Sequence, residues 1–458
     1  MRTYTQVFRA PEFTSLFVSS SLQVAASTVS GLALGTYVYA VTGAPLLAAL
    51  VMFGPSLAQL IGATALLSAA DRLPPRATMT FLAFAYGLGT AAQAIPGMPI
   101  AAIFAIALVL GALNALGGGV RYGLLIEILP AEGYLLGRSV LNMAVGIFQI
   151  TGFAVGGVLV TALSPRGTLL AGTALYLASA AAARWGLRHR PPRASGRPSV
   201  AQTMRTNRLL WSSVPRRYVY LGLWVPNGLI VGCEALYVSY APRYAGTLFA
   251  FAALGMLAGD ILAGRFIPPG LRDRLGPPLR LLLAAPYLIF VLHPALPLAE
   301  IAVTLASVGY SATLLLQQRL MALTPDELSG HALGLHSSGM LAMQGVGAAI
   351  AGAIAQQTSP AAAMTVMAAA SVGVTLLLAP GLRSPGDRLQ DSTRTPLDHA
   401  VPACGSSNAG AVHLFGCAVF PTANPTAPVG GKPTRRADAV LIPTAESAGA
   451  SADVSAAL

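Results

Sequence analysis

Two carboxyl residues lie inside long apolar segments of this sequence, where ionisable side chains are uncommon. Glu234 stands about two-thirds of the way along the apolar segment 217–241, and Asp260 lies in the next one, 246–266. Charged groups in an apolar environment are costly, and they commonly belong to ion or proton pathways. Glu234 is therefore the first candidate for a proton carrier, and Asp260 is the second.

Each polar residue in an apolar segment also has a structural interpretation. Glu234 can lie near enough to the outer end of its helix to reach water or to cap that end. Asp260 can pair with Arg265, although ion pairs along a helix prefer a spacing of three or four residues rather than five. Several uncharged residues can either bind a substrate or join neighbouring helices by hydrogen bonds: Gln23, Gln59, Asn114, Gln149, Asn227 and Gln344.

The composition indicates the environment that surrounds these residues. Hydrophobic residues make up 55% of the 458-residue chain, charged residues make up only 10%, and the mean hydropathy is +0.66. A soluble domain has about 25% charged residues, so most of this chain does not face water. The apolar segments reach the roughly 20 residues that cross a bilayer, and they lack the alternation of barrel strands. The sequence therefore predicts an all-α membrane protein.

Missing motifs exclude several classes of function. The sequence has no Gly-x-x-x-x-Gly-Lys-Ser/Thr loop for ATP phosphates, no metal-ligand spacing of Cys and His, and no large extramembrane segment for catalysis. We therefore expect no enzyme, no cofactor and no metal. The net charge of +12 comes nearly all from arginines in the connecting segments. Positive charge there retains a loop in the cytoplasm, so we do not expect a nucleic acid partner.

We predict twelve membrane-spanning helices arranged as two pseudo-symmetric six-helix bundles. Short turns, many of them marked by proline, make consecutive spans antiparallel neighbours. The first six spans are predicted at 13–39, 45–69, 78–97, 101–126, 138–163 and 168–186, and the second six at 217–241, 246–266, 280–296, 298–321, 332–357 and 361–380.

The segment between the two groups is strongly basic. It carries nine arginines from Arg184 to Arg217 and no apolar span, and we interpret it as a solvated cytoplasmic linker with a short surface helix near 199–211. The arginines of the other loops fall on the same side as this linker, whereas the opposite loops hold only Arg166 and Arg243. Both termini are therefore predicted to be cytoplasmic. The expected organisation is an N-terminal half (1–186), a linker (187–216), a C-terminal half (217–384) and a disordered cytoplasmic tail (385–458).

The two halves contain one segment written twice. Residues 129–165 and 323–360 align at an offset of about 193 residues, which places Gly146 over Gly339 and Gly152 over Gly345. Two related membrane halves in one chain are typical of secondary transporters.

A charged loop supplies a resemblance to a known family. The loop after the second span reads Asp71-Arg72-Leu73-Pro74-Pro75-Arg76, and it resembles the motif that the major facilitator superfamily carries between its second and third helices. An acid and arginines at a cytoplasmic helix end can form an ion-pair latch between conformational states. The alternative is a plain positive anchor.

Two further segments resemble parts of this superfamily. The fifth span contains Gly152-Phe153-Ala154-Val155-Gly156-Gly157, which is similar to the glycine element of its antiporters, although small residues also serve close helix packing. Arg121 late in the fourth span and Glu127 before Leu-Pro resemble the branch of bacterial siderophore and macrolide exporters.

The resemblance implies a set of functional residues. The cytoplasmic gate would comprise Asp71, Arg72, Arg76, Arg121 and Glu127, with structural pairing as the alternative role of Arg121 and Glu127. In this family the first, fourth, seventh and tenth helices line the cavity and the fifth and eleventh flank it, which implies substrate contacts at Gln23, Asn227, Gln149 and Gln344.

The function expected from the sequence is secondary active transport by alternating access. The favoured form is proton-coupled efflux of a small amphiphilic drug or secondary metabolite, by a monomer in the cell (inner or plasma) membrane. Two alternatives are open. One is proton-coupled uptake of a nutrient by symport, and the other is a membrane sensor that binds a ligand without moving it.

Overall fold

The structure is a computed structural model, and it describes residues 4–70, 73–191, 200–266, 269–325 and 328–382. These residues belong to one unit of the chain, Met1–Arg394. Every regular element among them is a helix. The predicted disordered tail lies outside the described residues and stays a prediction.

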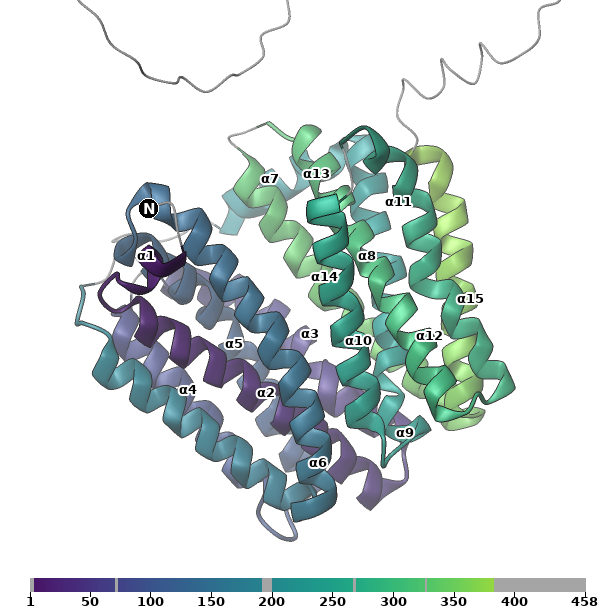
Figure 1. The fold of residues 1–458 in the computed structure, drawn as a ribbon, viewed down its shortest axis with the longest axis horizontal. Helices are drawn as coiled ribbons and strands as arrows, with labels where there is room; N and C mark the ends of the chain where they lie inside the picture. The colour runs from purple at the N-terminus through teal and green to yellow at the C-terminus, as the bar shows by residue number, and fades with distance from the viewer. Residues whose placement is uncertain (1–3, 71–72, 192–199, 267–268, 326–327, 383–458) are drawn as a thin grey trace, which may run out of the picture. The chain divides into compact units, whose positions relative to one another are not determined.

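The N-terminal half consists of one short helix and five long ones (Figure 1). The longest helix bends at Ser164, which has a φ of 71° and precedes Pro165, and this bend separates the predicted fifth and sixth spans. The helices are α1 (Tyr4–Phe8), α2 (Phe13–Thr42), α3 (Pro45–Ala70), α4 (Pro75–Gln93), α5 (Ile100–Ile128) and α6 (Ala131–Gly186).

The C-terminal half follows the linker helix α7 (Val200–Ser212), which agrees with the surface helix predicted near 199–211. Its helices are interrupted more often, by short 3₁₀ segments and by one π-helical segment, Leu262–Phe266, at the end of α10. They are α8 (Val214–Ala235), α9 (Tyr237–Tyr240), α10 (Ala245–Ile261), α11 (Pro269–Ala284), α12 (Leu296–Val308), α13 (Ala312–Ala322), α14 (Ser329–Gln357) and α15 (Pro360–Leu378).

Local sequence explains where many helices begin and end. Prolines occupy the first position of α3, α4, α11 and α15, where a missing N–H costs nothing. Gly43 ends α2 in the left-handed region with a φ of 62°, and its N–H donates to Tyr39 O over 2.8 Å. These signals place the turns close to the predicted positions.

Nine helical segments in the described residues are long and apolar enough to cross a membrane. One of them, Leu136–Gly186, has 51 residues and contains both the fifth and the sixth predicted span on either side of its bend. The second and third predicted spans correspond to α3, whose apolar part Pro45–Leu60 counts as a shorter helix, and to α4. The all-α membrane fold is confirmed.

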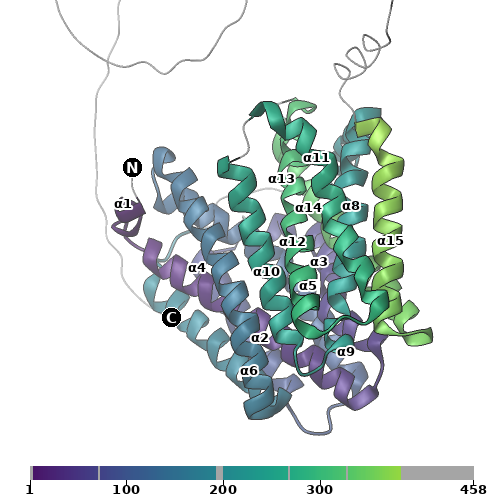
Figure 2. The ribbon, with the colours of Figure 1, turned by 45° about the vertical axis from the view of Figure 1, so that its right-hand side comes forward.

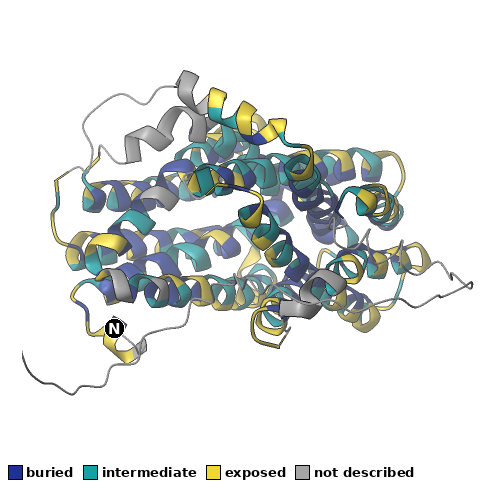
Figure 3. Cartoon of the chain, turned by 90° about the horizontal axis from the view of Figure 1, so that it is seen from above, coloured by how far each residue is buried: buried dark blue, intermediate teal, exposed yellow. Residues whose placement is uncertain are grey.

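Many large apolar side chains lie on the outer faces of these helices. Phe81, Leu88, Val109 and Val158 are each at least 60% exposed. In Figure 3 the exposed residues lie mainly on outward sides and connections, and the buried residues lie between helices. A water-soluble protein would bury such side chains, whereas a lipid environment accommodates them.

The duplicated segments form contacts between the two halves. The first part of α6 packs against α10, and α14 packs against α3, so each half extends one copy toward the other (Figures 1 and 2). Gly157 and Gly246 bring their backbones together, since a Cβ on Gly246 would lie 2.6 Å from Gly157 Cα. Phe153 stacks on Phe249 with ring centroids 4.7 Å apart. Close packing therefore explains glycines of the fifth span.

Candidate functional site

A cavity of about 420 Å³ lies among the helices of the N-terminal half. Its walls come from α2, α3, α4, α5 and the second part of α6. The polar residues that line it are Gln23, Ser27, Ser30, Gln59, Tyr86, Thr90, Gln93, Asn114, Arg121 and Tyr176. This volume and this mixture of polar and apolar walls suit a small organic molecule.

Arg121, on α5, is the single charged residue among the described residues that line this cavity. Its guanidinium has one described hydrogen bond, from Nη2 to Gln23 Oε1 over 3.5 Å, which is at the long limit for such a bond. Its Nε is buried and has no hydrogen-bond partner. No described carboxylate forms an ion pair with it.

A chain of polar contacts lies on the same cavity wall. Asn114 Nδ2 donates to Gln59 Oε1 over 3.0 Å, and the Tyr86 hydroxyl donates to Asn114 Oδ1 over 3.3 Å. Tyr86 stacks on Tyr176 with ring centroids 5.4 Å apart. These contacts hold amide groups and a flat aromatic face in the wall of the cavity that Arg121 also lines.

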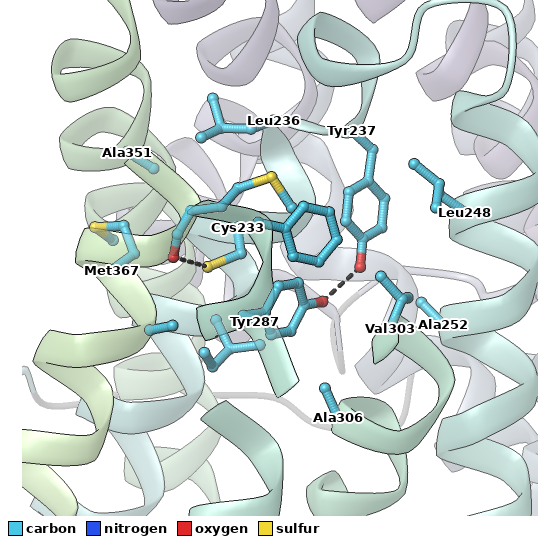
Figure 4. Packing of buried hydrophobic residues seen from close by; sticks show 14 of the residues in the cluster. Cys233, Leu236, Tyr237, Leu248, Ala252, Tyr287, Val303, Ala306, Ala351 and Met367 are labelled. Atoms are coloured by element: carbon cyan, nitrogen blue, oxygen red, sulfur yellow. Dashed lines mark hydrogen bonds between the residues drawn. The ribbon is translucent and has the colours of Figure 1, made fainter. Parts of the chain in front are cut away.

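Glu234 lies in the C-terminal half, in the last turn of α8, and is 6% exposed. The Tyr310 hydroxyl donates a hydrogen bond of 2.9 Å to its Oε1. Its neighbours along the chain, Cys233 and Tyr237, belong to the largest apolar cluster, in which Tyr237 hydrogen-bonds Tyr287 (Figure 4). Glu234 therefore does not reach water at the surface, and no described cation forms an ion pair with it.

Asp260 has a different environment. It lies in the last turns of α10 and is exposed, as is Arg265 in the following π-helical segment. The described residues show no ion pair between them. The structural interpretation of Asp260 as a partner of Arg265 is therefore not observed.

The remaining predicted substrate contacts do not gather in the cavity. Gln23 lines it, whereas Gln149, Asn227 and Gln344 do not. Asn227 is 3% exposed and its Oδ1 has no hydrogen-bond partner. Gln149 on α6 and Gln344 on α14 are partly buried. Their role in substrate contact stays a prediction.

The predicted gate residues also separate. Asp71 and Arg72 lie outside the described residues. Arg76, in the first turn of α4, lines a second cavity, of about 590 Å³, together with Arg184 and His189. Arg121 lies in the first cavity, some distance along α5 from Glu127 in the last turn.

Glu127 takes part in a charged cluster that sequence reasoning missed. Arg190, just after α6, donates from Nη1 and Nη2 to the carboxylate of Glu12 over 2.7 and 3.0 Å, and its Nε lies 3.3 Å from Glu127. The backbone N–H of Arg188 also donates to Glu12, over 2.9 Å. This cluster joins the start of α2, the end of α5 and the end of α6. An acid at a helix start was the only available signal.

Burial and these partners shift the pKa of Glu12 in opposite directions. Burial raises the pKa of its carboxyl group, but the hydrogen bonds from Arg190 and Arg188 and their positive charges outweigh it, so the pKa lies below its ordinary value of 4.5. Glu12 is therefore ionised at neutral pH.

Comparisons with known proteins agree with this architecture. Residues 16–321, well over half of the chain, match the sequence profile of the Major Facilitator Superfamily. The chain belongs to this superfamily. It is therefore a multi-pass membrane transporter of the secondary type and not an enzyme.

Solved transporters of this superfamily share the fold at low sequence identity. The nucleoside transporter NupG has a TM-score of 0.69 and 12% identity, over 81% of this chain and 100% of that chain. A bacterial homolog of the human lysosomal transporter Spinster, inward-facing and unoccupied, has a TM-score of 0.62 and 14% identity, over 81% and 95%. The peptide transporter POT in complex with sulfate has 0.63 and 15%, over 83% and 99%. A comparison with curated proteins found no match.

No cluster of three or more His, Cys, Asp or Glu that could hold a metal ion occurs in the part of the chain that the structure describes. The candidate site combines an arginine without a described ion pair, in a polar cavity, with a buried carboxyl group in the opposite half.

Proposed function

We propose that this transporter exports a small amphiphilic molecule in exchange for protons. The observation that carries the proposal is the buried carboxyl group of Glu234, which has a hydrogen-bond donor in Tyr310 and no described cation. A carboxyl group that is held in place but not neutralised by an ion pair is available to take up and release a proton. Asp260 is the reserve candidate, and its exposure makes it the weaker one.

The substrate path is supported by the cavity of the N-terminal half. Its walls combine amides, hydroxyls and aromatic rings with apolar side chains such as Leu34, Met52 and Leu110. An amphiphilic molecule can satisfy both kinds of wall at once. The branch of siderophore and macrolide exporters, which the segment around Arg121 and Glu127 resembles, supports the direction of export.

Alternating access is supported by where the halves meet. The contacts of Gly157 with Gly246 and of Gly352 with Leu46 lie toward the helix ends that we predict to be outside. We infer a conformer that is closed on the outer side. Transport would then require these contacts to open while cytoplasmic contacts form.

The test is flux through the full chain in proteoliposomes with an imposed pH gradient and a panel of hydrophobic dyes and antibiotics. We expect a proton gradient to drive the export of at least one compound, and we expect Glu234→Gln to abolish the coupling while binding persists. Glu300→Gln is the matched control. Glu300 lies near the start of α12, whereas Tyr310 follows the end of that helix, and Glu300 makes no described ion pair. Proton-coupled export that survives Glu234→Gln would refute the assignment of the carrier.

A second candidate is proton-coupled uptake by symport. It is favoured by the solved transporters of similar fold, whose names refer to nucleosides and peptides. The two functions differ in the sign of the response, since a symporter accumulates its substrate on the side to which protons flow. A membrane sensor would show binding without any gradient-driven flux.

A further inference from the structure

Arg121 is a cation inside a membrane helix for which the described protein supplies no counter-ion. Its one described hydrogen bond is the 3.5 Å contact to Gln23, and its Nε is buried without a partner. A guanidinium group has five N–H donors in a fixed planar arrangement. Holding such a group in an apolar environment without compensation is costly, so an unpaired arginine at this position indicates a ligand that completes it.

The surroundings of Arg121 define the ligand further. None of the described residues that line the cavity is Asp, Glu or Lys, so the cavity has an excess positive charge. The amides of Gln23, Gln59 and Asn114 offer further hydrogen-bonding groups, and the stacked rings of Tyr86 and Tyr176 offer a flat apolar face. Guanidinium groups match carboxylates with two parallel hydrogen bonds to a charged acceptor, which a primary amide, with its single acceptor oxygen, cannot form.

We propose that this cavity binds an anionic amphiphile, with its carboxylate or similar acidic group on Arg121 and its apolar part against Tyr86 and Tyr176. The cargo of the transporter is then an organic acid rather than a neutral or cationic drug. This statement about cargo rests on the proposed function, whereas the binding of the acid does not. Arg121 thereby acquires a role in recognition in place of the gating role that the sequence implied.

The binding test uses the full chain purified in detergent, with ligand affinity read from thermal unfolding. The probes are aromatic and alkyl monocarboxylates, each paired with its primary amide, beginning with naphthalene-2-carboxylate and naphthalene-2-carboxamide. At least one acid is expected to bind more tightly than its amide by roughly tenfold or more, because hydrogen bonds to charged groups contribute more than neutral ones.

Variants test whether Arg121 causes the preference for an acid over its amide. Arg121→Gln is expected to bind an acid and its amide equally, whereas Arg138→Gln, which removes an exposed arginine that stands over the Tyr122 ring, is expected to leave the preference unchanged. Arg121→Lys keeps the charge but loses the planar pair of donors. It is expected to weaken acid binding roughly tenfold without changing amide binding, and it serves as the test if Arg121→Gln does not fold.

Three results would overturn the proposal. The first is that no acid in the panel is preferred over its amide, and the second is that the preference survives in Arg121→Gln. The third is stabilisation by the anionic lipid dioleoylphosphatidylglycerol through Arg121 with no stabilisation by any acid, which would assign the cavity to a lipid headgroup. Flux separates the two proposals. Acid binding without proton-driven flux would refute the proposed export alone, and proton-driven flux without any preference for an acid over its amide would refute the anion site alone.

Discussion

The cluster of Glu12, Arg188, Arg190 and Glu127 makes a quantitative prediction about stability. Glu12→Gln keeps the size of the side chain but removes the charge that accepts two hydrogen bonds from Arg190 and one from the backbone of Arg188. Hydrogen bonds to charged groups contribute about 1.5–3 kcal/mol each, whereas exposed ion pairs contribute about 0–1 kcal/mol. The side chain of Glu12 is 7% exposed and that of Arg190 is 23% exposed, which places the pair between these limits.

We expect Glu12→Gln to lower the free energy of unfolding by about 2 kcal/mol at neutral pH. At roughly 2 °C per kcal/mol for a chain of this size, the melting temperature would fall by about 4 °C. The assay is thermal unfolding in detergent at one fixed scan rate, because membrane proteins often unfold irreversibly. Glu300→Gln is the matched control and is expected to change the melting temperature little.

The difference between wild type and Glu12→Gln also depends on pH in a defined direction. The pKa of Glu12 in the folded protein lies below its ordinary value of 4.5, so folding favours the ionised form. Its stabilising contribution is complete above 4.5 and is lost as the pH falls from there through the folded pKa. The two melting temperatures should therefore converge under acid conditions.

A double-mutant cycle with Arg190→Gln assigns the effect to the pair. The coupling free energy between the two substitutions is expected to be roughly 1 kcal/mol or more, since the residues are in direct contact. A loss in Glu12→Gln no larger than in Glu300→Gln, or additivity of Glu12→Gln and Arg190→Gln, would refute this reasoning.

Two more predictions concern packing in the membrane. Gly246→Ala should destabilise the protein by roughly 1–3 kcal/mol and reduce transport, because its Cβ would lie 2.6 Å from Gly157 Cα. Gly264→Ala is the control. A Cβ there would meet nothing within 4 Å, so thermal unfolding and flux should both stay close to wild type. Equal effects of the two alanines would contradict a close approach of the halves at Gly246. Cys233, buried at 0% exposure, should resist N-ethylmaleimide in the folded protein and react on unfolding. The assay uses a variant in which the other two cysteines of the sequence, Cys404 and Cys417, are replaced by serine. Rapid labelling of the folded protein would show that the apolar cluster is open.

Much of the fold could be predicted because the relevant signals are local. Long apolar segments, prolines at helix starts and Gly43 at a helix end are each read from a few neighbouring residues, and they placed most helices within a few positions of those observed. The largest difference is α11, which begins at Pro269 rather than at the predicted position 280. The duplicated segment predicted two related halves, and the structure shows how its copies are used, with α6 packed on α10 and α14 packed on α3.

The site was harder to predict because its contacts join distant parts of the chain. Glu234 was recognised from its apolar neighbours, but its partner Tyr310 lies 76 residues away. The pair of Glu12 and Arg190 spans 178 residues, and no spacing rule connects them. Arg121 was assigned to a gate by resemblance, which stays a prediction, and only the structure shows that it lines a cavity.

The sequence by itself determined that the chain is an all-α membrane protein of two related halves, because hydrophobicity and helix length depend on composition along the chain. Only the tertiary structure decided which polar residues share an environment. An arginine becomes an unpaired cation, and a glutamate a buried hydrogen-bond acceptor, only when the helices around them have packed. The charge that packing leaves uncompensated at Arg121 is therefore a property of the fold.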